Sequence, residues 1–204
     1  MAVPVKTRAP VGARRRAILA AAAQLFADHG YHATSINDIG AAVEVTGPAI
    51  YRHFGGKVDI LVEVIEGWMQ PLMEGVEKIS AAGLPAVETL DRLIDNFVGA
   101  AVESPAAYAV MARERQNLPK DERRAIDRAH RRHVEEWVRV VREVHPKLSD
   151  DEARTLVHGV FGLATPAMVR HPQMTADDLG ALVRAMATEV SRRGTSARRS
   201  VLGA

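Results

Sequence analysis

Residues 18–61 read ILAAAAQLFADHGYHATSINDIGAAVEVTGPAIYRHFGGKVDIL, and they carry the clearest structural pattern in the chain. Its first part places apolar residues at helical spacing, which predicts one amphipathic helix over residues 12–29. Gly30 follows at the position where glycine commonly ends a helix. A second, short helix is expected from Ser35, because Asp38 stands three residues further on and the two resemble a capping box.

A third helix follows a tight turn within the same stretch. Residues 44–46 make this turn, and Gly47-Pro48 opens the next helix, since proline suits the first helical position. We expect that helix to end at Phe54 and the two glycines after it. Two short helices joined by a three-residue turn are typical of a helix-turn-helix, which we place between Ser35 and Phe54. In such a motif the second helix lies in the major groove of DNA, about 12 Å wide, while the first crosses the backbone.

The remainder of the chain also has the sequence character of helices. Aromatic residues make up only 4% of the 204 residues, and no stretch alternates apolar and polar residues as a strand does. We therefore predict an all-α protein of about nine helices, in which an N-terminal three-helix domain precedes a C-terminal helical domain. The predicted divisions are a helix-turn-helix domain with a basic N-terminal arm over 1–57, a helical domain over 58–193 and a disordered basic tail over 194–204. The further helices are expected over 57–79, 86–103, 105–116, 119–144, 149–170 and 175–193.

The composition narrows the classes of function. The chain has no cysteine, which excludes disulfides, thiolate catalysis and cysteine-ligated zinc and fits a cytoplasmic protein. No apolar run approaches the roughly 18 residues of a membrane span, so we predict neither membrane insertion nor a signal peptide. Residues 1–57 hold seven Lys and Arg against three Asp and Glu, whereas residues 58–190 hold sixteen against twenty-two. A basic head on an acidic body indicates that the head meets a polyanion, unless the asymmetry is due to chance.

The same stretch closely resembles the N-terminal domain of the TetR family, over about residues 12–62. The block IYRHFGGK at residues 50–57 is its most specific part. The resemblance implies a transcriptional regulator, most simply a repressor, that binds a palindromic DNA operator as a homodimer. A small apolar or amphipathic effector of unknown identity would release it, and by analogy an acyl-CoA or lipid-like molecule is one candidate. The matching positions are Ile18, Ala22, Leu25, Phe26, Gly30, Tyr31, Thr34, Ile39, Ala42, Val45, Thr46, Ile50, Tyr51, His53, Phe54, Lys57 and Leu61.

The resemblance also assigns residues to a DNA interface. The start of the second helix and Lys57 would contact phosphates, and the N-terminal end of the recognition helix would meet base edges. Arg52 could read guanine in bidentate fashion or remain solvated. The expected DNA-binding residues are Thr34, Ser35, Thr46, Gly47, Pro48, Ala49, Tyr51, Arg52, His53 and Lys57. The basic arm adds Arg14, Arg15 and Arg16, which would follow the DNA backbone or enter a minor groove, the alternative being a solvated arm.

The entry to the recognition helix departs from the commonest family pattern. Family members often have a small or polar residue where Pro48 stands, and Gly47, Pro48 and Ala49 offer no side-chain hydrogen bonds to bases. Contact of Pro48 or Ala49 with a thymine methyl group remains open. We therefore expect sequence preference to rest on few base hydrogen bonds together with DNA shape.

In this family the C-terminal helices bind an effector and form the dimer, and the sequence offers candidates for both roles. Large or deformable side chains between the middle helices could line a pocket, although each could equally be core. The expected pocket residues are Trp68, Met69, Met73, Phe97, Tyr108, Met111, Arg113 and Trp137. The last two helices carry apolar and small residues, which favour close packing against a partner or within the chain. The expected interface residues are Leu156, Val160, Leu163, Leu179, Leu182, Val183 and Met186.

Two other classes of function remain as alternatives. His130 and His133 share a helix face and could suggest the metal site of an enzyme. However, the arginines around them repel a cation, so a solvated or core-edge pair is the simpler interpretation. The sequence has no Gly-rich phosphate loop and no nucleophile elbow. We therefore predict no catalytic residues, no metal and no cofactor. A helical interaction module that does not bind DNA is the second alternative, but it would not require a basic arm beside IYRHFGGK.

Overall fold

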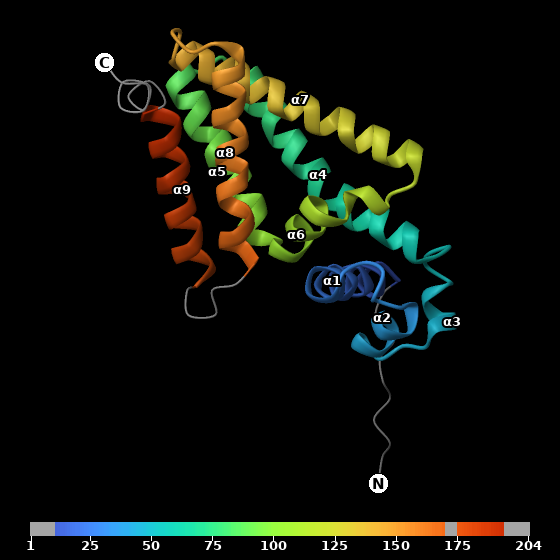
Figure 1. Ribbon diagram of the computed structural model, residues 1–204. Coiled ribbons are helices and arrows are strands. Elements are labelled where there is room, and N and C mark those ends of the chain that lie inside the picture. The colour runs from blue at the N-terminus through green and yellow to red at the C-terminus, as the bar shows by residue number, and fades with distance from the viewer. Residues whose placement is uncertain (1–10, 170–174, 194–204) are drawn as a thin grey trace.

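The computed structural model describes residues 11–169 and 175–193. Every regular element in these ranges is a helix, which confirms the predicted all-α class. The predicted basic tail at 194–204 and the basic residues before position 11 lie outside the described residues. The elements are α1 (Val11–His29), α2 (Ile36–Ala42), α3 (Gly47–Ile50), α4 (Lys57–Ala81), α5 (Ala86–Glu103), α6 (Pro105–Glu114), the 3₁₀ helix η1 (Arg115–Asn117), α7 (Lys120–Val144), α8 (Asp150–Val169) and α9 (Ala176–Arg193) (Figure 1).

Helices α1 to α3 form one end of the molecule, which we call the head (Figure 1). Its core is apolar, with Ile18, Phe26, Ile39, Ile50 and Phe54 all buried. These residues come from all three helices and from the turn after α3, so each short helix is held by tertiary packing rather than by its own length. The apolar spacing of the sequence therefore predicted the head's core.

The α2–α3 crossing depends on a close backbone approach at Gly40. A Cβ added there would lie 2.6 Å from the carbonyl oxygen of Val45, closer than real Cβ atoms come. The intervening turn contains Glu44, whose φ of 54° falls in the left-handed region that side chains disfavour. Ser35 caps α2, and Asp38 completes the predicted capping box. Local chemistry and one glycine thus fix the angle between the two helices.

Helix α3 is shorter than predicted, because it ends at Ile50 rather than Phe54. The chain then continues as a hydrogen-bonded turn, in which the Phe54 amide donates to the Ile50 carbonyl at 3.1 Å and the His53 amide donates to it at 2.8 Å. The side chains of residues 51–54 therefore still follow the helix closely. The recognition element consists of α3 and this turn.

Helices α4 to α9 form the second part, which we call the body. Helix α4 begins beside the head and runs into the body, where α7 lies along it, while α5, α8 and α9 stand side by side (Figure 1). The predicted bounds of α5 are confirmed residue for residue. Ser149 and Glu152 exchange the two hydrogen bonds of the predicted capping box at the start of α8. The predicted helix over 105–116 instead divides into α6 and η1.

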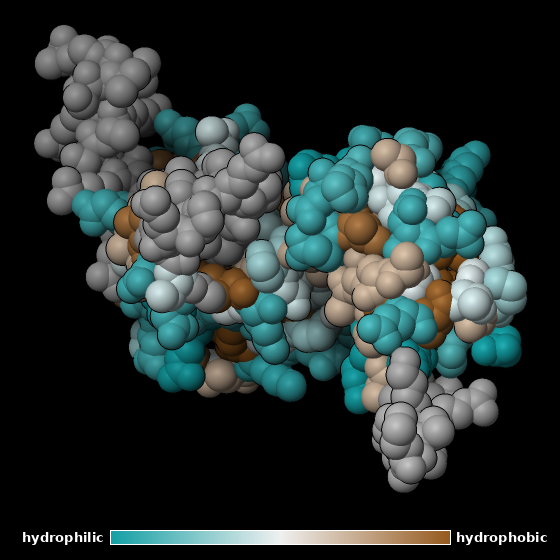
Figure 2. Space-filling view, turned by 90° about the horizontal axis from the view of Figure 1, so that it is seen from below, coloured by the Kyte–Doolittle hydropathy of each residue, from teal (hydrophilic) through white to brown (hydrophobic). Residues whose placement is uncertain are grey.

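The visible surface is mainly hydrophilic, and hydrophobic residues occur on it in small separate patches (Figure 2). Within the described residues, no helix is long and apolar enough to cross a membrane. The large apolar side chains are instead collected in the interior, where Trp137, Leu93 and Ile65 are fully buried. The body thus has a core large enough to hold an internal cavity.

Candidate nucleic-acid interface and ligand cavity

The recognition element presents a polar and aromatic face to the outside. Tyr51 is 58% exposed, and Thr46, Pro48 and Arg52 are exposed beside it. Ala49 and His53 are half-buried, whereas Gly47 is buried against α2. Because Ile50 and Phe54 point inward and pack in the core, the outward side chains contribute little to folding. Its groups are a phenol, a guanidinium, an imidazole and a hydroxyl, which suit contacts with phosphates and base edges.

Ser35 is exposed at the N-terminus of α2, but its hydroxyl is engaged. Its Oγ donates to Asp38 Oδ2 at 2.7 Å, and its amide donates to the same oxygen at 2.8 Å. These two donors lower the pKa of the Asp38 carboxyl. A phosphate contact by Ser35 would therefore share the site with a fixed carboxylate.

Thr34 and Lys57 are tied into the head rather than directed outward. Thr34 is only 2% exposed, and its hydroxyl faces the carbonyl oxygens of Gly30 at 3.0 Å and Leu25 at 3.3 Å. The ammonium of Lys57 donates to the carbonyls of Tyr31 and Thr34, each at 2.8 Å, and lies 4.4 Å from the centre of the Tyr31 ring. These side chains fasten the loop between α1 and α2 to the start of α4. Both side chains thus have partners within the chain, and their predicted phosphate contacts stay predictions.

The three arginines predicted for a basic arm lie inside α1. Arg14 donates to the carbonyl of Val43 at 3.3 Å, at the end of α2. Arg15 forms an ion pair with Glu63 and lies 4.6 Å from the centre of the Phe54 ring. Only Arg16 of the three is classed as exposed. Helix formation from Val11 onward thus directs Arg14 and Arg15 into contacts that join α1 to α2 and α4.

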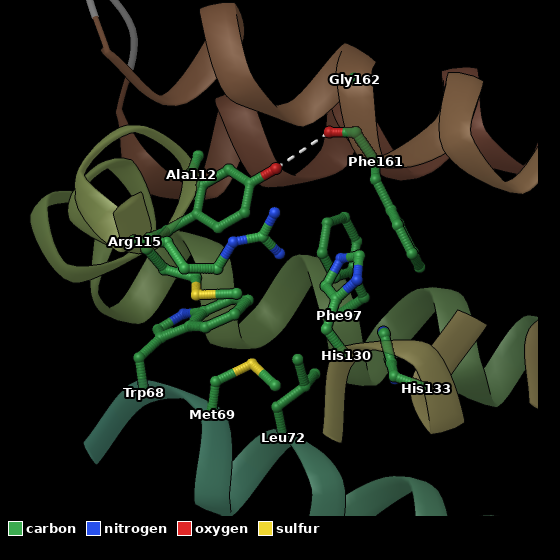
Figure 3. Close-up of a pocket in the computed structure, with 12 residues that line it drawn as sticks. Trp68, Met69, Leu72, Phe97, Ala112, Arg115, His130, His133, Phe161 and Gly162 are labelled. Carbon is green, nitrogen blue, oxygen red and sulfur yellow. Dashed lines mark hydrogen bonds between the residues drawn. The ribbon is translucent and has the colours of Figure 1, made fainter. Parts of the chain in front are cut away.

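The body encloses a cavity of about 220 Å³. Helices α4, α5, α6, α7 and α8 and the 3₁₀ helix η1 all contribute to it, and Figure 3 shows the lining side chains. Most of its wall is aromatic or thioether-bearing, while three of its members can carry a positive charge. The lining residues are Trp68, Met69, Leu72, Phe97, Tyr108, Met111, Ala112, Arg115, His130, His133, Phe161 and Gly162.

Two polar groups in this wall already have partners within the chain. The Tyr108 hydroxyl donates to the carbonyl of Phe161 at 2.9 Å, as the dashed line in Figure 3 marks. The indole N–H of Trp68 donates to the carbonyl of Ala100 at 3.2 Å. These bonds fix the two rings, so the rings act mainly as apolar surface.

His133 is different, because it is 3% exposed and neither ring nitrogen has a hydrogen-bond partner. Its ring stacks on Phe161 with centroids 5.1 Å apart and an interplanar angle of 13°. Burial lowers the pKa of His133 to about 3, and the charge of His130 adds to the effect. Burial is also the main cause that lowers the pKa of His130, and the nearby positive charge of Arg115 lowers it further. His133 is therefore neutral at physiological pH and keeps one donor and one acceptor unused.

Comparison with known proteins supports one family for this architecture. The description "Bacterial regulatory proteins, tetR family" matches residues 18–64, which span α2, α3 and parts of α1 and α4. The HTH-type transcriptional repressor KstR2 of Rhodococcus jostii strain RHA1 is 33% identical over 110 residues, which cover 54% of each chain. The N-terminal part of the chain is therefore similar to regulators of the TetR family. This relative is a regulator of transcription, and the chain spans about half of its length.

Two solved TetR-family structures share the fold over nearly the whole chain. The ketosteroid transcriptional regulator KstR2 of Mycobacterium tuberculosis superposes with a TM-score of 0.76 at 21% identity, covering 90% of this chain and 97% of that one. AibR, in complex with isovaleryl coenzyme A and operator DNA, gives a TM-score of 0.69 at 21% identity, covering 85% and 97%. The TetR-type arrangement therefore extends beyond the head to the body.

The cavity includes part of the pocket predicted from sequence. Trp68, Met69, Phe97, Tyr108 and Met111 line it, whereas Met73, Arg113 and Trp137 do not. Trp137 is fully buried behind the wall. Arg113 points the other way and donates to the carbonyl of Ala27 at 2.8 Å, near the end of α1.

Arg115, His130 and His133 were missing from the predicted pocket. The available signal was the spacing of His130 and His133, which lie three residues apart and thus on one helix face. Among the described residues, no group of three or more His, Asp or Glu side chains could hold a metal.

The predicted dimer residues differ in how much surface they offer. Leu182 and Met186 on α9 are 47% and 40% exposed. Val160 and Val183 are buried within the chain and Leu156 is half-buried, so intramolecular packing already uses them. The side chains of Leu163 and Leu179 lie outside the described residues. A partner would therefore meet the outer face of α9 first.

Proposed function

We propose that the chain is a ligand-responsive transcriptional regulator that binds a palindromic DNA operator as a dimer, most simply as a repressor in the cytoplasm. The observation that carries this proposal is the exposed face of the recognition element, where Tyr51 and Arg52 point outward from a head of TetR type. A tyrosine that is 58% exposed contributes little to folding, so its position favours a role in binding.

The proposed DNA contacts divide into two kinds. Arg52, Pro48 and Ala49 would meet base edges in the major groove, with Arg52 as the one guanidinium able to pair with a guanine. The remaining contacts would go to phosphates and would fix the position of the head without reading sequence. They come from Ser35, Thr46, Tyr51 and His53 and from the amide of Gly47.

Thr34 and Lys57 receive a supporting role in this proposal. Their hydrogen bonds hold the loop between α1 and α2, which carries the N-cap of α2. They would thereby keep the first helix of the motif at the angle that docking requires. The arginines of α1 act in the same way, and Arg16 remains as their candidate for a phosphate contact.

The proposed dimer uses the outer face of α9. Two heads related by a two-fold axis would then enter successive major grooves, about 34–36 Å apart. Leu182 and Met186 supply apolar area that one chain leaves exposed. Association of this kind accounts for large exposed apolar residues on an otherwise hydrophilic surface.

The segment α6–η1 supports a coupling between the cavity and the head. Met111, Ala112 and Arg115 line the cavity. Arg113 holds the end of α1 from the same segment, and Asn117 contacts His32 across a 2.9 Å hydrogen bond. An effector that shifts this segment would move the contacts to the head, and a ligand that prefers one head position shifts the population toward it.

Selection of bound fragments from genomic DNA tests the proposal. Purified chain should enrich fragments that share a two-fold symmetric sequence, and footprinting should protect both half-sites on one face of the duplex. Enrichment of random fragments, or protection of a single half-site by a monomer, would contradict it. The genes beside the enriched site would then indicate what the effector is.

A further inference from the structure

We propose that the cavity binds a small carboxylic acid with an apolar body and one further oxygen, the carboxylate lying at Arg115 and His130 and the oxygen at His133. This inference rests on the proposed function, because the acid would be the effector. It assigns a chemical class to the ligand and a separate task to each of three polar side chains.

The size of the cavity limits the body of the ligand. A dry cavity of about 150 Å³ holds a benzene molecule. The cavity here measures about 220 Å³, which leaves room for one ring with a short substituent or for a branched chain of similar size. Trp68, Met69 and Phe97 offer flat or deformable surfaces against such a body.

The positive end of the cavity is formed by Arg115 and His130. Figure 3 shows the Arg115 guanidinium extending into the cavity toward the imidazole of His130. Arg115 is held by one ion pair, from Nη1 to Asp127 Oδ1 at 3.4 Å, which leaves its other N–H groups for a ligand. Because a guanidinium matches a carboxylate with two parallel hydrogen bonds, an acid is the natural partner.

The electrostatic surroundings of His130 also favour an anion. Arg115, Arg131 and His158 each disfavour a proton on His130, and Asp127 is the one carboxylate that favours it. A bound carboxylate would oppose those three groups and add to Asp127. His130 could then donate to the ligand in either charge state, with the ring oriented by the bound acid.

The inner polar group is His133, whose unpaired nitrogens have no explanation in the chain alone. A buried polar group without a partner costs roughly as much as a lost hydrogen bond, and most native structures avoid it. His133 lines the cavity, so a ligand oxygen can reach it. A hydroxyl fits best, because it can accept from the ring N–H or donate to the unprotonated ring nitrogen, whichever of the two faces the ligand. The bonded rings of Tyr108 and Trp68 leave His133 as the selective group in that part of the wall.

The experiment measures dissociation constants for four ring compounds by calorimetry on the full chain. The probes are benzoate, 3-hydroxybenzoate, 4-hydroxybenzoate and the neutral isostere 4-hydroxybenzamide. Fragments of this size bind with dissociation constants on the order of 1 mM. The better hydroxybenzoate should bind about tenfold more tightly than benzoate and about tenfold more tightly than the amide. Equal binding of acid and amide would overturn the proposal.

Two variants separate the tasks of the polar groups. Arg115→Gln should abolish the preference for acid over amide, and His133→Phe should abolish the preference for hydroxybenzoate over benzoate while preserving the preference for acid. Arg128→Gln, an exposed change on α7, is the matched control and should alter neither ratio. A hydroxyl preference that survives in His133→Phe would also overturn the proposal. Thermal unfolding of each variant checks that it folds.

The same preparations distinguish this inference from the function on which it rests. Retained binding of the selected operator fragment with no discrimination among the probes would overturn the acid site alone. Absence of operator binding would overturn the proposed function, while the probe measurements would still decide the chemistry of the cavity. Release of the operator by the better hydroxybenzoate, and not by the amide, is the result expected if both hold.

Discussion

The head and the body use polar side chains in opposite ways. In the head, the buried Thr34 and the half-buried Lys57 have hydrogen-bond partners, and the groups available for binding lie outside on the recognition element. In the body, the outer surface carries many ion pairs, whereas His133 is buried inside without a partner. On the proposed function, this difference suits a head that meets a large polyanion from outside and a body that encloses a small molecule able to give His133 a hydrogen-bond partner.

The largest effect should come from breaking the helix crossing of the head. Gly40→Ala places a methyl group against the Val45 carbonyl oxygen, a backbone atom that cannot rotate away. We expect a loss of about 3 kcal/mol in the free energy of unfolding of the head and loss of DNA binding. Circular dichroism and chemical denaturation measure the loss.

Gly99→Ala on α5 is the control for that change. Nothing lies within 4 Å of a Cβ at this position, so alanine should stabilise its helix by about 0.5–1 kcal/mol. If both substitutions had the same effect, the close approach at Gly40 would not be what orients the motif.

The next largest effect should come from replacing His133, the buried side chain of the body whose ring nitrogens lack hydrogen-bond partners. His133→Phe replaces a buried imidazole with an apolar ring of similar shape, so the ligand-free protein should gain about 1 kcal/mol at pH 7. Because the folded pKa of His133 is about 3 and the unfolded value is about 6.5, this histidine's stabilising contribution is fully present above pH 6.5 and declines as the pH falls toward 3. The variant's advantage should therefore grow by about 2 kcal/mol between pH 7 and pH 5.

Denaturant unfolding of the two proteins at both pH values measures that difference. A pH-independent difference would mean that the imidazole is protonated or hydrated in the folded state. It would also remove the contrast between a head whose polar groups have hydrogen-bond partners and a body in which His133 has none.

Changes on the exposed face of the recognition element should affect DNA binding without affecting folding. Arg52→Ala should cost about 1–3 kcal/mol of operator binding and relax the preference at one base pair. Tyr51→Ala should weaken binding to every sequence by about tenfold, because the phenol would contact phosphate. Fluorescence anisotropy with labelled operator measures both.

Arg92→Ala, an exposed arginine on α5, should leave the operator affinity unchanged. If Arg52→Ala and Tyr51→Ala also left the operator affinity unchanged, the recognition element would not be what contacts the DNA.

The smallest effect on DNA binding is expected at Lys57, where one substitution separates a structural role from a phosphate contact. Lys57→Met removes the ammonium from the carbonyls of Tyr31 and Thr34, and we expect a loss of about 1–2 kcal/mol in stability. The slope of log affinity against log salt should stay the same, whereas loss of a phosphate contact would reduce it by about 1. Lys78→Met, in the last turn of the same helix, controls for the lost charge. A reduced slope would mean that Lys57 contacts a DNA phosphate.

Sequence predicted the parts of this molecule that follow local rules. The caps at Ser35 and Ser149 and the bounds of α5 depend on residues a few positions apart, and all three are confirmed. Tertiary placement was harder to predict. Arg113 and Arg115 are two residues apart and so face different sides of the segment, and only the fold determines that Arg115 is the one that lines the cavity.

The same limit explains what was missed in the site. Lys57 matches a family position, yet no spacing rule reveals that its ammonium meets carbonyls 23 and 26 residues earlier. His130 and His133 stand among arginines in the sequence, which favoured a solvated or core-edge pair. The structure buries His133, and both imidazoles line the cavity, which the sequence did not indicate. On a helix with one charged and one buried face, the neighbouring residues in the sequence do not show which face a histidine occupies.

The ratio of specific to non-specific DNA affinity decides whether the head is a sequence-specific DNA-binding domain. Titrating the full chain against the selected fragment and against a scrambled fragment of equal length, at two or more salt concentrations, gives this ratio. We expect the selected fragment to bind at least about 10³-fold more tightly, with an affinity that falls steeply as salt increases. Equal affinity for the two fragments would show that the head does not read DNA sequence.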